Sequence, residues 1–317
     1  PKKTGYLLIK REIANIDNIS DLIRARKLVK KYFTKNLLKK MKYQNCQFNK
    51  INSYNIKHYK KEGFLLIKNV LNKQDLKHIE NSIFKKIKKI EKQKKLDFKK
   101  LEENEKLLSL RKKYPKYFAE IFDTLQTMVS NYNILSKEKL LRLIEKILGV
   151  PRYYITLTDI SVRMDAPKDN RNKLEWHQDS SYYRQNSNGK NGVVLWTPLV
   201  NKVTKNLGPL QILYKSHELG PLNTPREKSG KKFSSKKRTI DNKLLKKFNK
   251  IIEFKMNLGD VVLINHDMVH RSGNNLSKKF RFSLIGRYHN SLSLDFNPGL
   301  NVYKYSDQKI QRDVHGK

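Results

Sequence analysis

Cysteine is almost absent from this chain. Cys46 is the single cysteine among 317 residues, which excludes an internal disulfide and a metal site built from cysteine ligands. Long apolar runs are missing as well. None approaches the length of a membrane-spanning helix, and the first residues lack the apolar segment of a signal peptide. We therefore expect a chain without a membrane span that works in a reducing cytoplasm.

Acidic side chains are also scarce. The chain has 29 Asp and Glu against 69 Lys and Arg, a formal net charge of +40. Such a balance suggests an anionic partner, for example a nucleic acid, a membrane surface or an acidic substrate. The excess is mostly lysine spread along the whole chain, whereas nucleic-acid binders concentrate arginine for bidentate phosphate contacts. The composition favours a solvated lysine surface, disfavours nucleic acid as a partner and assigns no function.

Helical patterns precede strand patterns along the chain. Residues 1–58 are polar and predict an N-terminal extension that is partly helical, with a helical period of apolar residues over 21–33. A buried strand follows Gly63. Residues 72–150 then predict helices, of which the first is capped by Asn72. The later helices are expected at 115–131 and 136–148.

After Pro151 the sequence becomes β-rich, and residues 291–317 predict a polar tail. Gly, Pro and Asn turns separate short apolar segments at a spacing typical of a sandwich or barrel. The expected strands are 153–162, 192–198, 208–214, 251–256, 260–265 and 280–288. Helices first and a β structure second indicate an α+β class, with the functional site in the β part of a single domain over 59–290.

A histidine and a carboxylate stand one residue apart in Trp176-His177-Gln178-Asp179. On an extended segment, residues i and i+2 point to the same face, so both side chains can reach one metal ion. A second histidine, His270, follows Asp179 by 91 residues at the end of an apolar run, and Arg281 stands eleven residues further on. Two His and one Asp form the facial triad of non-haem Fe(II) oxygenases, which leaves metal positions open.

Several alternatives stay open at these positions. His266 lies near His270 and is a rival ligand, although the residues after His270 and its spacing to Arg281 favour His270. Trp196 is either a pocket residue or plain core. Arg163 and Arg287 are further inward-facing cations whose roles the sequence leaves unassigned.

The order and spacing of these segments resemble the phytanoyl-CoA dioxygenase family. The segments that carry the resemblance begin at Gly63, Trp176, Gly192, Asn206, Gly259, His270 and Arg281, and together they span about residues 59–290. The resemblance implies a double-stranded β-helix (jelly-roll) core at 151–290, flanked by the N-terminal helices of 72–150. It also implies Fe(II) as the metal and 2-oxoglutarate and O2 as co-substrates, with ascorbate as a candidate stimulant.

The resemblance further implies a role for each site residue. His177, Asp179 and His270 would bind the iron, and Arg281 would hold the distal carboxylate of 2-oxoglutarate. The other expected co-substrate residues are Gln178, Trp196, Ser272 and Ser283. Ser283 shares a strand face with Arg281, so that a hydroxyl and a guanidinium can serve one carboxylate.

The sequence and the resemblance therefore predict a dioxygenase that hydroxylates a small-molecule or acyl-type substrate, with an anionic substrate as one candidate, and releases succinate and CO2. No catalytic residue beyond the metal ligands is expected, because the metal carries the chemistry. Two alternatives are an oxygenase acting on nucleic acid, suggested by the charge and by the pair Arg281 and Arg287, and a non-enzymatic jelly-roll binding protein.

Overall fold

The computed structural model describes residues 5–9, 12–16, 46–47, 53–168, 174–182, 186, 188–222, 224 and 240–297. The chain divides into two compact units, 1–45 and 46–317. In the first, β1 (Gly5–Ile9) pairs antiparallel with β2 (Glu12–Ile16). The helical period predicted over 21–33 lies outside the described residues. In the second unit, α3 (Ser53–Glu62) runs across the predicted boundary at residue 58.

Helices form a layer at the start of the second unit, after the short β3 (Cys46–Gln47), α3 and β4 (Phe64–Lys68). The helices that follow are α4 (Lys73–Gln93), α5 (Glu103–Lys113), α6 (Pro115–Gln126), α7 (Val129–Leu135) and α8 (Glu138–Leu148). Asn72 caps α4, as predicted, with its side-chain oxygen 2.7 Å from the amide nitrogen of Gln74. The single helix expected over 115–131 is two helices, because the chain is extended at Met128.

Two sheets make up the β part. The large sheet has the order β3-β4-β9-β6-β11-β5, and the small sheet has the order β10-β7-β8. Their remaining strands are β5 (Ile155–Asp165), β6 (Gly192–Pro198), β7 (Leu210–Leu213), β8 (Ile251–Phe254), β9 (Val261–Asn265), β10 (His270–Ser272) and β11 (Arg281–Asn290). The short helix α9 (Asn242–Leu245) precedes β8. Sequence periodicity missed β10, since its three residues are too few to show an alternation, and it also missed β1, β2 and β3 in the N-terminal part of the chain.

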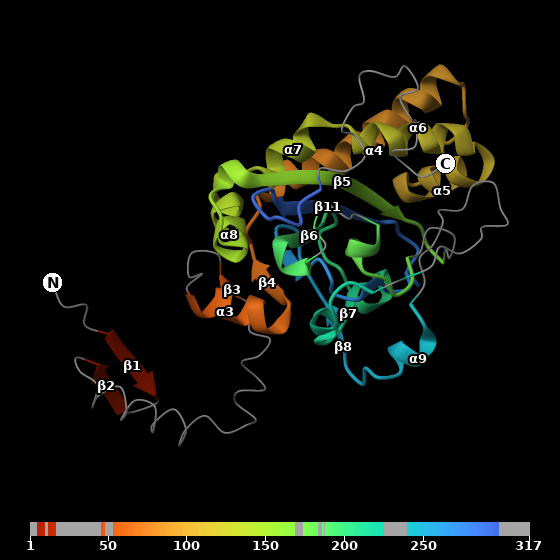
Figure 1. Cartoon of the computed structure of the whole chain (residues 1–317). Helices are drawn as coiled ribbons and strands as arrows, with labels where there is room; N and C mark the ends of the chain where they lie inside the picture. Colours follow the sequence, from red (N-terminus) through yellow and green to blue (C-terminus); the bar gives the residue numbers. More distant parts are fainter. Residues whose placement is uncertain are drawn as a thin grey trace, which may run out of the picture. The chain divides into compact units, whose positions relative to one another are not determined.

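Both faces of the large sheet are buried, which explains the continuous apolar character of β6 and β9 and the burial of every residue of β11. On one face, Val193 and Leu195 pack into a core shared with α4 and α8. On the other face, Val194 and Trp196 join a second core that includes Ile212 of the small sheet. Figure 1 shows α4, α6 and α7 above β5 and β11, with β7 and β8 below. The fold is therefore an α+β jelly roll flanked by N-terminal helices, as predicted.

No helix among the described residues is long and apolar enough to cross a membrane.

Gly63 links α3 to β4 at a point where a side chain has no room. Its φ is +76°, and a Cβ atom built there would lie 2.5 Å from Cγ of His217 and 2.5 Å from Cε of Met268. Its carbonyl accepts a hydrogen bond from the amide of Asn265, at the end of β9. Gly63 therefore brings the entry strand close to the loop that precedes β10.

We predict that Gly63→Ala destabilises the protein more than Gly149→Ala does. Gly149 ends α8 with a similar φ of +72°, but a Cβ there would meet nothing within 4 Å. Gly149→Ala should lower the free energy of unfolding by about 1 kcal/mol through backbone strain alone. Gly63→Ala should cost about 1–3 kcal/mol more through overlap with His217 and Met268. Denaturant unfolding measures both values, and equal losses would contradict the packing argument.

Candidate metal centre and co-substrate pocket

His177 and His270 meet through their own backbones. The amide of His177 donates to the carbonyl of His270 at 3.0 Å, and the amide of His270 donates back to the carbonyl of His177 at 2.9 Å. This antiparallel bridge extends the small sheet beyond β10 and places the two imidazole rings 4.2 Å apart, centroid to centroid. Two histidines that are 93 positions apart in the sequence are thus neighbours by strand pairing.

Each of these imidazoles is oriented by a carbonyl two residues before it. Nδ1 of His177 lies 2.7 Å from the carbonyl oxygen of Glu175, and Nδ1 of His270 lies 2.8 Å from that of Met268. A proton on Nδ1 in both rings leaves the Nε2 lone pairs available to a metal. Burial, together with the nearby imidazole of His177, lowers the pKa of His270 to about 3. The His270 ring is therefore neutral, the form that binds metals.

Asp179 completes the group. Gln178 is extended, so Asp179 points to the same side as His177 even though it begins a short 3-10 turn over Asp179–Ser181. Its Oδ1 atom lies 3.6 Å from Nε2 of each histidine. Its Oδ2 atom accepts a hydrogen bond of 2.7 Å from Nε of Arg287. Burial opposes ionisation of Asp179, but Arg287 and the two histidines outweigh it and hold the pKa of this carboxyl well below its ordinary value.

The three buried donor atoms all lie within 4.8 Å of one another, and among the described residues this is the one such group that could hold a metal ion. Two imidazole nitrogens and one carboxylate oxygen are the donor set of a non-haem Fe(II) site. The residues present therefore fit the ion. His266 is not part of the group: its ring is buried against His289, 4.9 Å from centroid to centroid.

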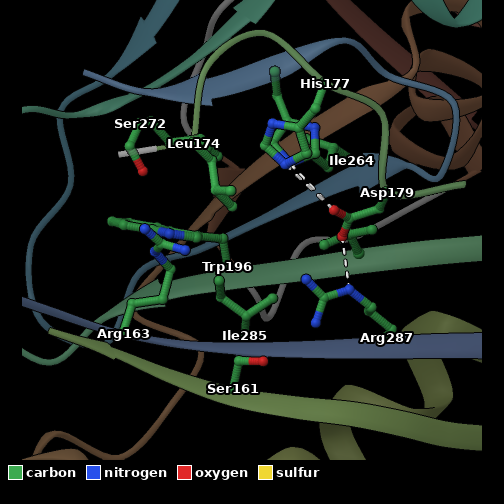
Figure 2. A pocket seen from close by; sticks show the side chains of 13 residues that line it. Ser161, Arg163, Leu174, His177, Asp179, Trp196, Ile264, Ser272, Ile285 and Arg287 are labelled. Atoms are coloured by element: carbon green, nitrogen blue, oxygen red, sulfur yellow. Dashed lines mark hydrogen bonds and ion pairs between the residues drawn. The ribbon is translucent and has the colours of Figure 1, made fainter. Parts of the chain in front are cut away.

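A pocket opens beside this group, between the two sheets (Figure 2). Its wall combines apolar and polar side chains, and Trp196 of β6 forms part of the apolar portion. Polar atoms enter it from Ser161, Arg163, Ser272 and Arg287. The apolar wall residues are Leu174, Val194, Trp196, Leu210, Ile264 and Ile285.

Near one side of the pocket, a carboxylate lies between two arginines. Arg281 and Asp165 are directly opposite each other on β11 and β5, and Ser283 and Arg163 form the next pair on the same face. Asp165 accepts a hydrogen bond of 2.6 Å from Nη2 of Arg281 and one of 2.8 Å from Nη2 of Arg163. Burial opposes ionisation of Asp165, but the two guanidinium groups outweigh it and keep the pKa of its carboxyl below its ordinary value. The cluster carries one net positive charge.

The co-substrate residues expected from the sequence are only partly brought together. Nη2 of Arg281 also donates to the hydroxyl of Ser272 at 2.9 Å, and the Arg281 guanidinium lies 5.8 Å from the centre of the Trp196 ring. Ser283 is fully buried on the same strand. Gln178 lies apart from the pocket. Its amide donates to the carbonyls of Gly220 and Asp267, and it accepts from the amide nitrogen of Leu222.

Two contacts escaped the sequence analysis. Asp165 was not recognised as the partner of Arg281, although Arg163 and Asp165 stand at i and i+2 on one strand and so share a face. The hydrogen bond from Arg287 to Asp179 had only a weak signal in the sequence: Arg281, Ser283 and Arg287 are separated by even numbers of residues, which places them on one face of a strand.

We predict that a buried neutral histidine makes the fold sensitive to acid. Burial lowers the pKa of His266 from 6.5 to about 4, so between these values the unfolded chain binds a proton that the folded chain does not. Stability should therefore fall as the pH drops from 6.5 to 4, by up to about 3 kcal/mol from this residue. His266→Phe should reduce the pH dependence of the unfolding free energy, measured with a chelator present. His78→Phe, at an exposed position of α4, is the matched control and should leave it unchanged.

An unaltered pH dependence in His266→Phe would contradict this account.

The chain is also similar to several solved structures whose sequences are only distantly similar to it. The non-heme monooxygenase ThoJ is 15% identical, with a TM-score of 0.48 over 73% of this chain and 75% of that one. The alpha ketoglutarate dependent epimerase SnoN from nogalamycin biosynthesis is 14% identical, with a TM-score of 0.49 over 75% of this chain and 80% of that one. EvdO2 from Micromonospora carbonacea var. aurantiaca is 14% identical, with a TM-score of 0.49 over 78% and 95%.

No curated protein matches the sequence. A family model gives a direct assignment, because the model of the phytanoyl-CoA dioxygenase (PhyH) family matches residues 59–283. This range contains α4 to α8, the strands from β4 to β10, the start of β11 with Arg281, and the three candidate metal ligands. The chain therefore belongs to the phytanoyl-CoA dioxygenase family and is an Fe(II)- and 2-oxoglutarate-dependent oxygenase.

Proposed function

We propose that this oxygenase hydroxylates a small-molecule substrate, with His177, Asp179 and His270 as the iron ligands. The observation that carries the proposal is the convergence of three buried donor atoms within 4.8 Å of one another in the wall of a pocket. Three protein donors would leave three of the six positions of Fe(II) open, enough for a chelating 2-oxo acid and dioxygen.

The overall reaction balances without a protein base. Substrate, O2 and 2-oxoglutarate give hydroxylated substrate, succinate and CO2, with one oxygen atom entering the substrate and the other entering succinate. Bound Fe(II) would supply the oxidative chemistry of this conversion. The protein's own part is to hold the two organic molecules in place and to keep bulk water from the pocket, which the apolar wall around Trp196 favours.

Arg281 is the proposed anchor for the distal carboxylate of 2-oxoglutarate. Its Nη2 is engaged by Asp165 and Ser272, but its Nε and Nη1 atoms are buried and have no hydrogen-bond partner among the described residues. Buried donors of this kind require an acceptor, and a carboxylate offers two oxygens to a guanidinium. The Ser283 hydroxyl is likewise buried without a partner and is available to the same carboxylate.

We assign Ser272 and Trp196 to the same co-substrate site and leave Gln178 out of it. The hydroxyl of Ser272 holds Arg281, and Trp196 lies beside its guanidinium. Gln178 uses both ends of its amide on backbone groups, so its role is to fix the chain around Gly220 and Leu222.

Arg163 gives the proposed substrate a point of attachment. It lies in the wall of the pocket, and its side chain keeps a partial exposure of 18% while paired with Asp165. This cation, beside the apolar residues of the wall, suits a substrate with an apolar part and an anionic group.

We expect the purified protein with Fe(II) and 2-oxoglutarate to release succinate in step with hydroxylation of its substrate. A screen of small anionic and acyl-type compounds, with ascorbate present, measures this release. Loss of a residue that only supports a metal ligand typically weakens metal binding about 10–100-fold. His177→Ala and His270→Ala each remove a proposed ligand, so each should weaken metal binding by more than this and should abolish succinate release. His266→Ala is the matched control and should keep both. Retention of the metal in His270→Ala with its loss in His266→Ala would reverse the assignment.

A second prediction concerns the anchor. Arg281→Lys keeps the charge but removes the planar fork, so the Michaelis constant for 2-oxoglutarate should rise about 10–100-fold while iron affinity changes little. Arg271→Lys is the control, because Arg271 packs over Trp176 and bonds Gln211 away from the pocket. An unchanged Michaelis constant in Arg281→Lys would transfer the role to Arg163.

A further inference from the structure

The two oxygens of Asp179 face different partners. Oδ1 points to the histidines, at 3.6 Å from each Nε2 atom, while Oδ2 is bound by Nε of Arg287 at 2.7 Å. Both side chains of this ion pair are buried, with exposures of 6% for Arg287 and 2% for Asp179. Figure 2 shows His177 and Arg287 on opposite sides of the carboxylate. We propose that Arg287 is a positioning residue that limits Asp179 to one metal-binding oxygen, an inference that rests on the proposed metal site.

Asp179 needs such a partner because its own geometry does not fix the carboxylate. The terminal torsion of an aspartate is broad, and rotation about it exchanges the two oxygens or turns both toward the same point. A carboxylate that binds with both oxygens occupies two metal positions. With two histidines it would leave two of six positions, one fewer than a chelating 2-oxo acid and dioxygen require together. Occupation of Oδ2 by a charged donor prevents this arrangement.

Arg287 is itself held by an irregularity in the neighbouring strand. Ile285 pairs with Ser161 and Arg287 pairs with Thr158, so β5 has one residue more than β11 in this interval. Asp159 lies in this bulge with a φ of +46°, and its carbonyl accepts a hydrogen bond of 2.6 Å from Nη1 of Arg287. The bulge therefore supplies a fixed acceptor for Nη1 of Arg287, while Nε of the same guanidinium donates to Asp179.

The test uses Co(II) as a redox-stable substitute for Fe(II) and measures binding, without turnover. Arg287→Met keeps the length of the side chain and removes its donors. We expect Co(II) still to bind, its visible absorption to change as Asp179 changes its mode of ligation, and the dissociation constant of 2-oxoglutarate for the Co(II)-loaded protein to rise at least about ten-fold. Arg271→Met, on β10 of the small sheet, is the control and should change none of these.

Two variants of the bulge act on Arg287 without touching it. Asp159→Gly suits the positive φ and keeps the carbonyl in place, so it should bind 2-oxoglutarate like the unaltered protein. Asp159→Val is strained at that φ, should displace the carbonyl, and should weaken 2-oxoglutarate binding in the same direction as Arg287→Met. Comparison of these two variants tests the role of Arg287 even if Arg287→Met does not fold.

The outcomes separate the two proposals. If the unaltered protein fails to bind Co(II), or binds it equally well after His177→Ala, the metal site itself is wrong. If the unaltered protein binds Co(II) and 2-oxoglutarate, and Arg287→Met and Asp159→Val do so with unchanged affinity and absorption, the role of Arg287 is refuted. A parallel loss of folding stability and Co(II) affinity in both variants, with 2-oxoglutarate affinity unchanged in the metal-loaded fraction, would indicate a structural role only and would also refute it.

Discussion

The site depends first on the backbone pairing of His177 with His270. Two hydrogen bonds, of 3.0 and 2.9 Å, join these residues directly, and β10 ties the second of them to β7 of the small sheet. The proposed metal ligands are therefore positioned by a sheet and not by a flexible loop, and each ring takes its orientation from a carbonyl two residues earlier in its own segment. Asp179 follows the extended Gln178 and completes the group at the start of a 3-10 turn, in which its carbonyl accepts a hydrogen bond from the amide of Tyr182.

Charged side chains buried near the pocket are paired with opposite charges, whereas most of the lysines on the surface have no such requirement. The surface lysines give the chain its net charge of +40, yet the buried carboxylates near the pocket are each matched to arginine: Asp179 to Arg287, and Asp165 to both Arg163 and Arg281. Buried charges require such partners, and the planar guanidinium satisfies several acceptors at once. The surface charge and the site chemistry are thus separate features, and the former gives no reason to favour a nucleic-acid substrate.

The sequence was sufficient to predict the fold class and the three residues that meet at the candidate metal site. The central strands β6 and β9 are continuous apolar segments bounded by turn residues, and Asn72 carries a recognisable cap. What escaped were partnerships decided by three-dimensional detail. The hydrogen bond from Arg287 to Asp179 depends on a β-bulge at Asp159, and no local sequence pattern predicts this bulge. Gln178 was expected to line the co-substrate site because of the family resemblance, whereas its amide hydrogen-bonds backbone groups of Gly220, Leu222 and Asp267. The break between α6 and α7 is similarly local, because it depends on one extended residue, Met128.

Strand β11 carries both Arg281 and Arg287, six residues apart on one face. At about 3.4 Å per residue the two arginines start about 20 Å apart along a straight line, and their side chains lean toward different carboxylates. The length of this strand segment therefore sets the distance between the proposed metal centre and the proposed co-substrate anchor. The neighbouring strand β5 accommodates an extra residue in its bulge. In β11, an insertion of one residue between the two arginines would turn one of them toward the helical layer, because successive side chains point to opposite faces of a strand. Evolution of this site should consequently vary the length of β5 and the loops around it while leaving that interval of β11 constant.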